Sequence, residues 1–213
     1  MVKTRLTNIN KNKIIKKINS FYISTIKNVS QFSGGNNTGG KIRQSMGELG
    51  EELAGLTWLE IAKLYSDISK PVEPIKGEKD RKRCVNKKGN TYDAHVDKHC
   101  YINDKFILAI ESKSYLDSCY YARASSDFRL LKEYYDRNLI CVVLSIENAA
   151  KESSKKFVED EGWIDGTFIL TDGKRSSAKP IWNKDFYKKL NHDKVGEFVD
   201  FIDELFCKHL KSK

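Results

Sequence analysis

The feature that most constrains the fold is a short apolar run that ends in two charged residues. Phe106–Ile110 is continuously apolar and rich in aromatic and β-branched side chains, which predicts a strand buried on both faces. Glu111 and Lys113 follow it, although charge inside a core is costly. Residues two apart on a strand point to the same face, so we expect the Glu111 carboxylate and the Lys113 ammonium side by side, about 7 Å apart.

A segment with alternating acids and histidines precedes this strand. Asn103 and Asp104 are a turn-forming pair, and before them Asp93, Asp97 and His99 fall at alternating positions. We therefore expect one strand over these residues, which pairs with Phe106–Ile110 in a hairpin.

The length of the turn decides which side chains meet across the hairpin. If Asn103 and Asp104 alone form the turn, Val96 lies opposite Glu111 and the odd-numbered side chains face away. A three-residue turn, or a β-bulge, instead puts Asp93, Asp97, Glu111 and Lys113 on one face. A shared site at this place requires one of the latter two arrangements.

Two carboxylates and an ammonium on one face suit the chemistry of a metal-assisted hydrolase. Glu111, Asp97 and a substrate phosphate oxygen are hard oxygen ligands of the kind that Mg²⁺ prefers. Lys113 would orient or deprotonate the attacking water and offset the charge of the phosphate. A solvated charge pair is the ordinary alternative, but this strand is too apolar for an exposed edge.

These residues carry a resemblance to a known superfamily. Asp97, a turn, and then Glu111-Ser112-Lys113 resembles the signature of the PD-(D/E)XK nucleases, and the string from Asp97 to Asp117 is similar to the core of some type II restriction endonucleases. The likeness covers roughly residues 45–146, and it lacks the proline that often precedes the first acid. The resemblance implies an α/β fold, with a central mixed β-sheet flanked by helices (a restriction-endonuclease-like core).

The resemblance also implies site residues, a cofactor and a reaction. Asp97, Glu111 and Lys113 would be catalytic, with Asp93 and His99 in reserve, although a hydrogen-bonded structural role suits His99 better. Mg²⁺ would be the cofactor, and Mn²⁺ would be able to replace it. Water would attack the scissile phosphorus of double-stranded DNA in line, leaving 3′-hydroxyl and 5′-phosphate ends. A homodimer, with one subunit for each strand, would make a double-strand break.

Other functions remain open on the sequence alone. A repair or junction-resolving nuclease would carry the same core. A non-catalytic DNA-binding protein would use Glu111 and Lys113 only as a salt bridge. A restriction enzyme is the favoured interpretation. It leads us to expect a cognate DNA methyltransferase in the same system, although the nuclease would not physically require it as a partner.

Composition favours a polyanionic partner. The 213 residues include 38 Lys and Arg against 29 Asp and Glu, a formal net charge of +9, which suits nucleic acid. The five cysteines have neither zinc-finger spacing nor a disulfide pattern. No stretch has the length of a transmembrane helix and no signal peptide is evident, so we expect no membrane partner and a location in the cytoplasm of a prokaryotic cell.

The chain length suits one nuclease domain over residues 1–213. Residues 1–32 would be a basic helix or arm, laid on DNA or merely solvated, and residues 33–40 a Gly-rich linker or loop. A long helix is predicted over 41–68. Nucleases of the suspected superfamily often draw a glutamate from such a helix, and the candidates here, as metal ligands, are Glu48 and Glu52, with Glu51 as a third.

A basic segment just before the hairpin is the strongest candidate for DNA contact. Seven of the fifteen residues from Lys76 to Asn90 are Lys or Arg, and each one that neutralises a phosphate adds salt-dependent affinity. A later turn after Asp172 carries further basic and small polar residues. The DNA-contact candidates are Lys41, Arg43, Lys79, Arg81, Lys82, Arg83, Lys87, Lys88, Arg123, Lys174, Arg175 and Ser176, of which Arg175 is favoured for base reading.

The remaining periodicity completes the α/β pattern. A helix over 114–137 and a buried strand over 139–146 predict a right-handed crossover and a strand parallel to Phe106–Ile110. A short helix over 149–161 and a strand over 163–171 follow. The apolar face of a final helix over 194–210 would belong to the core, or else to a dimer surface, and core is favoured.

Overall fold

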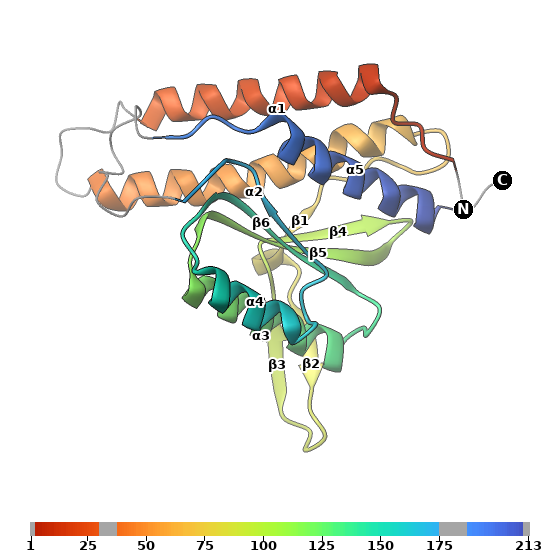
Figure 1. The fold of residues 1–213 in the computed structure, drawn as a ribbon. Coiled ribbons are helices and arrows are strands. Elements are labelled where there is room, and N and C mark those ends of the chain that lie inside the picture. The colour runs from red at the N-terminus through yellow and green to blue at the C-terminus, as the bar shows by residue number, and fades with distance from the viewer. Residues whose placement is uncertain (1–2, 30–37, 175–186, 211–213) are drawn as a thin grey trace.

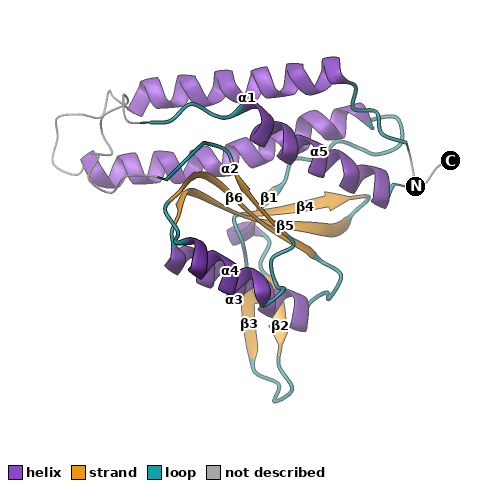
Figure 2. Cartoon of the chain, viewed as in Figure 1, coloured by secondary structure: helices purple, strands orange, loops and turns teal. Residues whose placement is uncertain are grey.

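A mixed β-sheet flanked by helices forms the centre of the protein (Figures 1 and 2). The computed structural model describes residues 3–29, 38–174 and 187–210; the side chains of residues 29 and 38–44 are not among those described. Five strands hydrogen-bond in the order β1-β4-β5-β6-β7. The predicted fold class, α/β with a central mixed sheet between helices, is confirmed.

The elements follow the predicted alternation of strands and helices. The helices are α1 Asn8–Val29, α2 Thr38–Leu64, α3 Ser118–Tyr134, α4 Glu152–Asp160 and α5 His192–His209. The strands are β1 Ile75–Lys76, β2 Lys82–Val85, β3 Thr91–Ala94, β4 Lys98–Ile102, β5 Lys105–Leu116, β6 Ile140–Asn148 and β7 Gly166–Ile169.

The two faces of the sheet are covered by different helices. Helices α1, α2 and α5 lie on one face, and α3 and α4 on the other (Figure 2). The apolar stripe of α1 that includes Ile14, Ile18 and Tyr22 is buried in the first layer, as is the Val195 and Phe198 face of α5. Helix α1 is therefore packed into the core along its length, and the apolar face of α5 is not an exposed dimer surface.

Strand β5 runs further than its apolar residues predicted. It continues through Glu111 and Lys113 to Leu116. The reason is β6, which pairs with β5 in parallel from Leu108↔Ile140 to Leu116↔Asn148 and satisfies its backbone on one side. The expected parallel crossover is confirmed, but the charged residues lie within the strand rather than after its end.

A β-bulge sets the register of the β4–β5 hairpin. The turn contains only Asn103 and Asp104, both with positive φ (49° and 62°), and Ile102 pairs with Lys105. Between Tyr101↔Phe106 and Cys100↔Leu108 the register shifts by one residue, because Ile107 is the extra residue on β5. The bulge supplies the arrangement that a shared site requires, despite the two-residue turn.

The single strand expected over Asp93–His99 is wrong. Strand β3 ends at Ala94 and β4 begins at Lys98, with an irregular segment between them. Strands β2 and β3 pair with each other in a separate two-stranded sheet, the β2–β3 ribbon, which projects away from the body of the protein (Figure 1). The chain thus leaves the ribbon and enters the central sheet within three residues.

The cysteines and the helices bear on the expectations from composition. All five cysteines are free, and Cys84, Cys100 and Cys141 are buried. None of the helices among the described residues is both long and apolar enough to cross a bilayer.

Candidate active site

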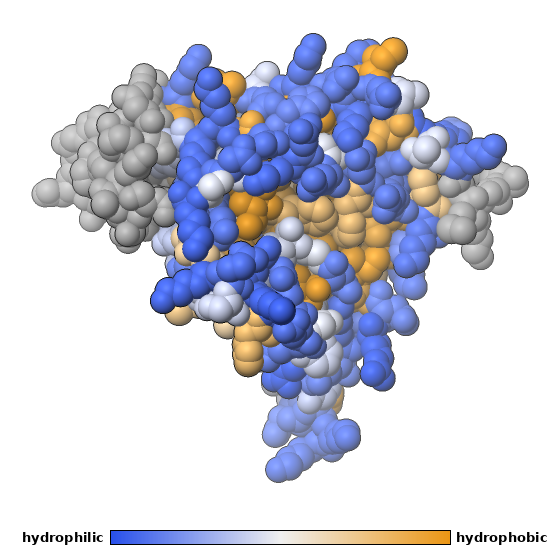
Figure 3. Space-filling view, viewed as in Figure 1, coloured by the Kyte–Doolittle hydropathy of each residue, from blue (hydrophilic) through white to orange (hydrophobic). Residues whose placement is uncertain are grey.

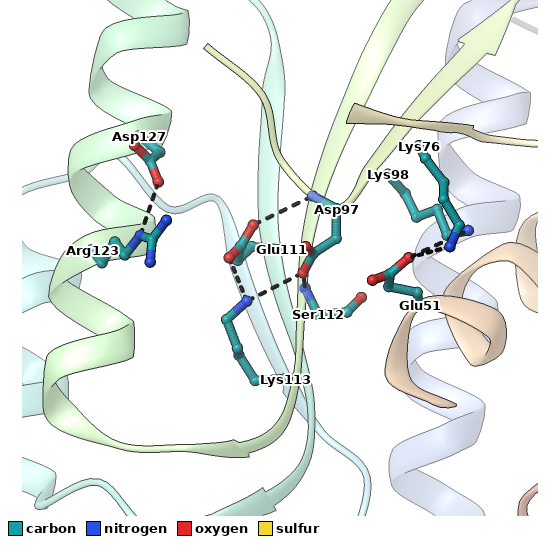
Figure 4. Close-up of polar contacts among 9 residues, drawn as sticks. All are labelled: Glu51, Lys76, Asp97, Lys98, Glu111, Ser112, Lys113, Arg123 and Asp127. Atoms are coloured by element: carbon teal, nitrogen blue, oxygen red, sulfur yellow. Dashed lines mark hydrogen bonds and ion pairs between the residues drawn. The ribbon is translucent and has the colours of Figure 1, made fainter. Parts of the chain in front are cut away.

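Three charged side chains converge where β4 begins beside β5 (Figure 4). Lys113 Nζ lies 2.5 Å from Glu111 Oε1 and 3.3 Å from Asp97 Oδ2. The backbone N–H of Asp97 donates to Glu111 Oε2 at 3.4 Å. The bulge makes this possible, since Lys98 pairs with Ile110 and the preceding residue therefore falls beside Glu111.

Asp97 is held by backbone groups although it lies outside any strand. The backbone N–H of Ser112 donates to Asp97 Oδ2 at 2.7 Å. On the other side, the N–H of Gly77 donates to the Asp97 carbonyl oxygen at 3.4 Å. A Cβ on Gly77 would lie 1.8 Å from the carbonyl oxygen of Val96, so only glycine permits this approach. The segment that carries Asp97 is fixed from both sides.

Burial and a neighbouring charge both act on the Glu111 carboxyl group. Burial and the negative charge of Asp97 raise the pKa of Glu111 to about 6, against the opposing effect of Lys113. Burial alone would lower the pKa of Lys113, but the charges of Glu111 and Asp97 outweigh it, so that pKa is raised. Lys113 is therefore a cation at neutral pH, which suits a hydrogen-bond donor to water or phosphate and not a base.

A cavity of about 310 Å³ opens beside these residues. Its walls come from α2 through Glu51, from the segment after β3 through His95, and from α3 through Arg123 and Asp127. Arg123 Nε lies 3.9 Å from Asp127 Oδ2, and its side chain is 75% exposed. Burial raises the pKa of Asp127, and the nearby positive groups oppose that rise. The cavity thus has an acidic floor and an arginine at its rim.

The structure distinguishes the three glutamates of α2. Glu51 points toward the site and lies 3.5 Å from Lys76 Nζ and 3.9 Å from Lys98 Nζ (Figure 4). Burial and the charge of Asp97 raise its pKa. Glu48 lines an adjoining cavity of about 450 Å³ that Glu51 and Asp97 also line. Glu52 lies instead beside residues of α1. The expectation for Glu52 is corrected by helix geometry: Glu51, four residues after Gly47, shares the cavity face.

Neither reserve catalytic residue lies in the site. Asp93 is on the β2–β3 ribbon, exposed, and 3.8 Å from Arg83 Nε. His99 is fully buried: its Nδ1 is 3.1 Å from Asp80 Oδ2 and its Nε2 accepts from the N–H of Val96 at 3.4 Å. Asp93 lies outside the site because β3, which carries it, ends at Ala94 and does not continue through Asp97. His99 has the structural, hydrogen-bonded role that its residue type favoured.

The basic residues proposed for DNA contact differ in their exposure to solvent. Lys79, Arg81, Arg83, Lys87 and Lys88 are exposed on or near the β2–β3 ribbon, and Lys174 is exposed after β7. The side chains of Lys41 and Arg43, and the whole of Arg175 and Ser176, lie outside what the structure describes.

Lys82 departs from the expectation of a free phosphate contact. Its ammonium is half-buried, 2.7 Å from Asp80 Oδ1 and 2.5 Å from the Tyr101 hydroxyl. It also lies about 5 Å from the ring centres of Tyr101 and Phe106. Lys82 therefore anchors the root of the β2–β3 ribbon to the central sheet.

The donor set fits a hard divalent cation. Within the described residues no group of three or more His, Cys, Asp and Glu side chains is placed to hold a metal ion. Asp97 and Glu111 supply two carboxylates, and Mg²⁺ is commonly held by one or two carboxylates together with waters and substrate phosphates. Burial and the charge of Asp97 both disfavour the ionised form of Glu111 and raise its pKa, and a divalent cation held between the two carboxylates would favour that form.

Sequence reasoning did not assign roles to three residues of this region. His95 lines both cavities and is exposed, and Asp127 forms the far wall. Gly77 holds the segment of Asp97 in place. Asp127 could have been found from its spacing, because it falls four residues after Arg123 on a predicted helix. Nothing local marks Gly77, since its close neighbour is far away in sequence.

Comparison with known proteins gives one informative match. The chain is similar to a type II restriction enzyme. That protein is the type II restriction enzyme DdeI of Desulfomicrobium norvegicum, with 25% identity over 131 residues, which cover 54% of this chain and 53% of that enzyme. The chain thus spans about half the length of the curated relative it matches. No family model matches the chain, and no solved structure matches it.

Proposed function

We propose that the protein is a divalent-metal-dependent endonuclease that hydrolyses phosphodiester bonds of double-stranded DNA, as a site-specific type II restriction enzyme. The observation that carries the proposal is the convergence of Asp97, Glu111 and Lys113, with the Lys113 ammonium in contact with both carboxylates. The PD-(D/E)XK pattern in the sequence and the similarity to a restriction enzyme support the same function.

The three side chains would have two roles, which are to hold the metal ion and to position the reactants. Asp97 and Glu111 would hold Mg²⁺, or Mn²⁺ in its place. When bound, the ion supplies a Lewis acid for the phosphate and lowers the pKa of a coordinated water. Lys113 is held as a cation by its two carboxylate neighbours, and it would donate to the attacking water or to a phosphate oxygen as negative charge develops there.

The reaction is a hydrolysis at phosphorus. The water oxygen forms a bond to phosphorus while the bond to the 3′ oxygen breaks. One water proton is lost from the attacking oxygen and one proton is taken up by the leaving oxygen, which gives 3′-hydroxyl and 5′-phosphate ends. Arg123, exposed at the cavity rim, would contact the phosphate backbone. A homodimer would cut both strands, with one site for each strand.

The test is digestion of long unmethylated linear DNA from several genomes. Wild type, Glu111→Ala and the control Glu52→Ala are compared with Mg²⁺ and with EDTA. We expect discrete bands from wild type and from Glu52→Ala with Mg²⁺ only, and none from Glu111→Ala. The control is matched because Glu52 is also a glutamate but lies away from the cavity.

Other outcomes assign the protein differently. A smear that requires Mg²⁺ and Glu111 would retain the nuclease and remove site specificity. Cleavage restricted to branched DNA would favour the junction-resolving alternative. DNA binding without cleavage on any substrate, with or without metal, would contradict the catalytic proposal.

A further inference from the structure

The β2–β3 ribbon projects from the body of the protein and is not part of the central sheet. Among the residues that the structure describes, its strands pair only with each other, from Lys82↔Ala94 to Val85↔Thr91, and its end protrudes from the body as a hydrophilic tip (Figures 1 and 3). A two-stranded ribbon is marginally stable unless one face packs on something else. The packing of its root and the composition of its free surface therefore indicate what it is for.

The root of the ribbon is fixed to the walls of the candidate active site. Cys84 and Ala94 are buried in the core layer beneath α3, and Cys84 Sγ lies 3.5 Å from the carbonyl oxygen of Leu130 on that helix. The same helix carries Arg123 and Asp127 on the cavity wall. Asp97 follows Ala94 by three residues. Any ligand on the ribbon is thus held at a set distance from the Asp97 carboxylate.

The tip of the ribbon is preorganised. The N–H of Asn86 donates to the carbonyl oxygen of Asn90 at 3.0 Å. The Asn86 side-chain oxygen accepts from the N–H groups of Lys88 (2.9 Å) and Asn90 (3.0 Å). Gly89 supplies the positive φ of 81° that closes the turn. A tip ordered in advance loses little entropy when it binds.

The exposed charges of this region are mainly positive. Lys79, Arg81, Lys87 and Lys88 are exposed, and none of them forms an ion pair with a described residue. Lys87 and Lys88 stand together at the tip. Uncompensated cations on a protruding element repel one another and favour contact with a polyanion.

The outer face of the ribbon carries groups that can read base edges. Arg83 pairs across the strands with Asp93, and Val85 with Thr91, all exposed and all on the face opposite Cys84 and Ala94. The Arg83 side chain is 72% exposed, and Val85 is 47% exposed. Arginine donates to guanine, aspartate accepts from cytosine, and apolar groups contact the thymine methyl.

We propose that the β2–β3 ribbon enters the major groove of double-stranded DNA, with Lys87 and Lys88 on phosphates and the Arg83–Asp93 face toward the base edges. The major groove, about 12 Å wide, admits a two-stranded ribbon, whereas the minor groove is about 6 Å wide. This inference deepens the proposed nuclease function, because the ribbon would place a scissile phosphate at the Asp97–Glu111 site.

Binding without cleavage tests the ribbon separately from catalysis. Fluorescence anisotropy is measured in EDTA with a random-sequence duplex and with duplex fragments of the digested DNA, over a range of salt concentrations. The Lys87→Ala/Lys88→Ala variant is compared with wild type and with Lys13→Ala/Lys16→Ala. The control pair is also exposed, but it lies on α1 at the opposite end of the molecule (Figure 1).

We expect the tip variant to bind every duplex more weakly, and its plot of log affinity against log salt to be shallower by about 2. The α1 variant should bind like wild type. Methyl green, which occupies the major groove, should displace the protein, and the minor-groove ligand netropsin should not. Arg83→Ala should narrow the difference in affinity between a preferred fragment and the random duplex.

Several results would overturn the ribbon proposal. They are absence of duplex binding by wild type, an unchanged salt dependence in the tip variant, and displacement by netropsin alone. Each can occur whether or not the protein cleaves DNA. Conversely, loss of affinity in the tip variant would support the ribbon even if no Mg²⁺-dependent cleavage were found, in which case only the nuclease proposal would fail.

Discussion

The backbone N–H of Ser112 donates to Asp97 Oδ2 at 2.7 Å, so the first acid of the candidate site is held by the strand that carries the second. An asparagine at position 97 would keep an acceptor for this N–H and lose the negative charge. Asp97→Asn should therefore fold normally and lower the rate of DNA cleavage with Mg²⁺ at least about a hundredfold. The measurement is single-turnover cleavage, with thermal unfolding as a check on folding.

Asp104→Asn is the matched control for that substitution. Asp104 is exposed in the two-residue turn at the opposite end of β4 from Asp97, and asparagine tolerates its positive φ of 62°. Its cleavage rate should stay close to that of wild type. Equal losses of rate in both variants would contradict the assignment of Asp97.

Lys113 is expected to act on the reactants rather than on the metal. Lys113→Ala removes the cation that contacts both carboxylates, so affinity for Mn²⁺, measured by calorimetry, should stay the same or rise. Cleavage should fall by at least about a hundredfold. Loss of metal affinity together with activity would instead mean that Lys113 is needed to assemble the two acids.

Glu51 and Glu52 are neighbours in the sequence, but we expect their substitution to affect the affinity for Mn²⁺ differently. Glu51 neutralises Lys76 and Lys98, whose charges would otherwise face Asp97 unopposed. Glu51→Gln should therefore weaken Mn²⁺ binding about tenfold, within the range for groups that support metal ligands. Glu52→Gln should leave it unchanged. The measurement is calorimetric titration of both variants with Mn²⁺ at one pH, and equal affinities in the two variants would contradict this role for Glu51.

Gly77 offers a test of the backbone that supports the site. A methyl group there would meet the carbonyl oxygen of Val96, so Gly77→Ala should displace the Asp97 segment and cost about 1–3 kcal/mol of unfolding free energy. Gly55→Ala is the control, because nothing lies within 4 Å of the added Cβ and alanine favours the helix. In denaturant unfolding Gly77→Ala should be the less stable variant, and in the cleavage assay it should be the slower one.

Buried His99 should make stability depend on pH. Burial lowers its pKa below the ordinary value of 6.5, against the opposing effect of Asp80. The unfolded state then binds the proton more readily, so stability is complete above about pH 6.5 and falls as the pH drops below it. The pKa of Asp80 is also lowered, from 3.8, and matters only in more acidic solution.

The raised pKa of Glu111, about 6, contributes in the opposite direction over this range, so each variant is compared with wild type at the same pH. Between pH 7 and pH 5 the denaturant midpoint of His99→Gln should fall less, or rise more, than that of wild type, since the titrating group is gone. The exposed His95 gives the control, and His95→Gln should retain the full dependence. If the control flattened the profile as much as His99→Gln, burial of His99 would not be its cause.

The sequence predicted the local features of the site better than the long-range ones. Glu111 and Lys113 could be placed because they follow an apolar strand at a spacing that puts both on one face. The bulge at Ile107 could not be placed, because that residue continues the apolar pattern and nothing in its identity marks an extra residue. Its occurrence was nevertheless the condition under which Asp97 could reach Glu111.

The misplaced residues share a physical cause. Alternation over the seven residues from Asp93 to His99 predicts one continuous strand that also carries Asp97. The chain breaks after Ala94 because the β2–β3 ribbon takes up the preceding residues. The sequence does not favour Glu51 over Glu48 and Glu52 for a related reason. The face that a helix turns toward a site depends on what lies opposite, and the sequence of α2 does not contain that information.

The bulge also restricts how the length of this protein can change in evolution. Because side chains on a strand alternate between faces, loss or gain of one residue between the turn and Glu111 on β5, or between Asp97 and the turn on β4, would turn Asp97 away from Glu111. Two residues lost or gained there would restore the alternation, and a change confined to the turn would leave the pairing as it is. We infer that related genes with a working site differ within these two strands by even numbers of codons, unless the bulge at Ile107 disappears or a second one arises in the same lineage.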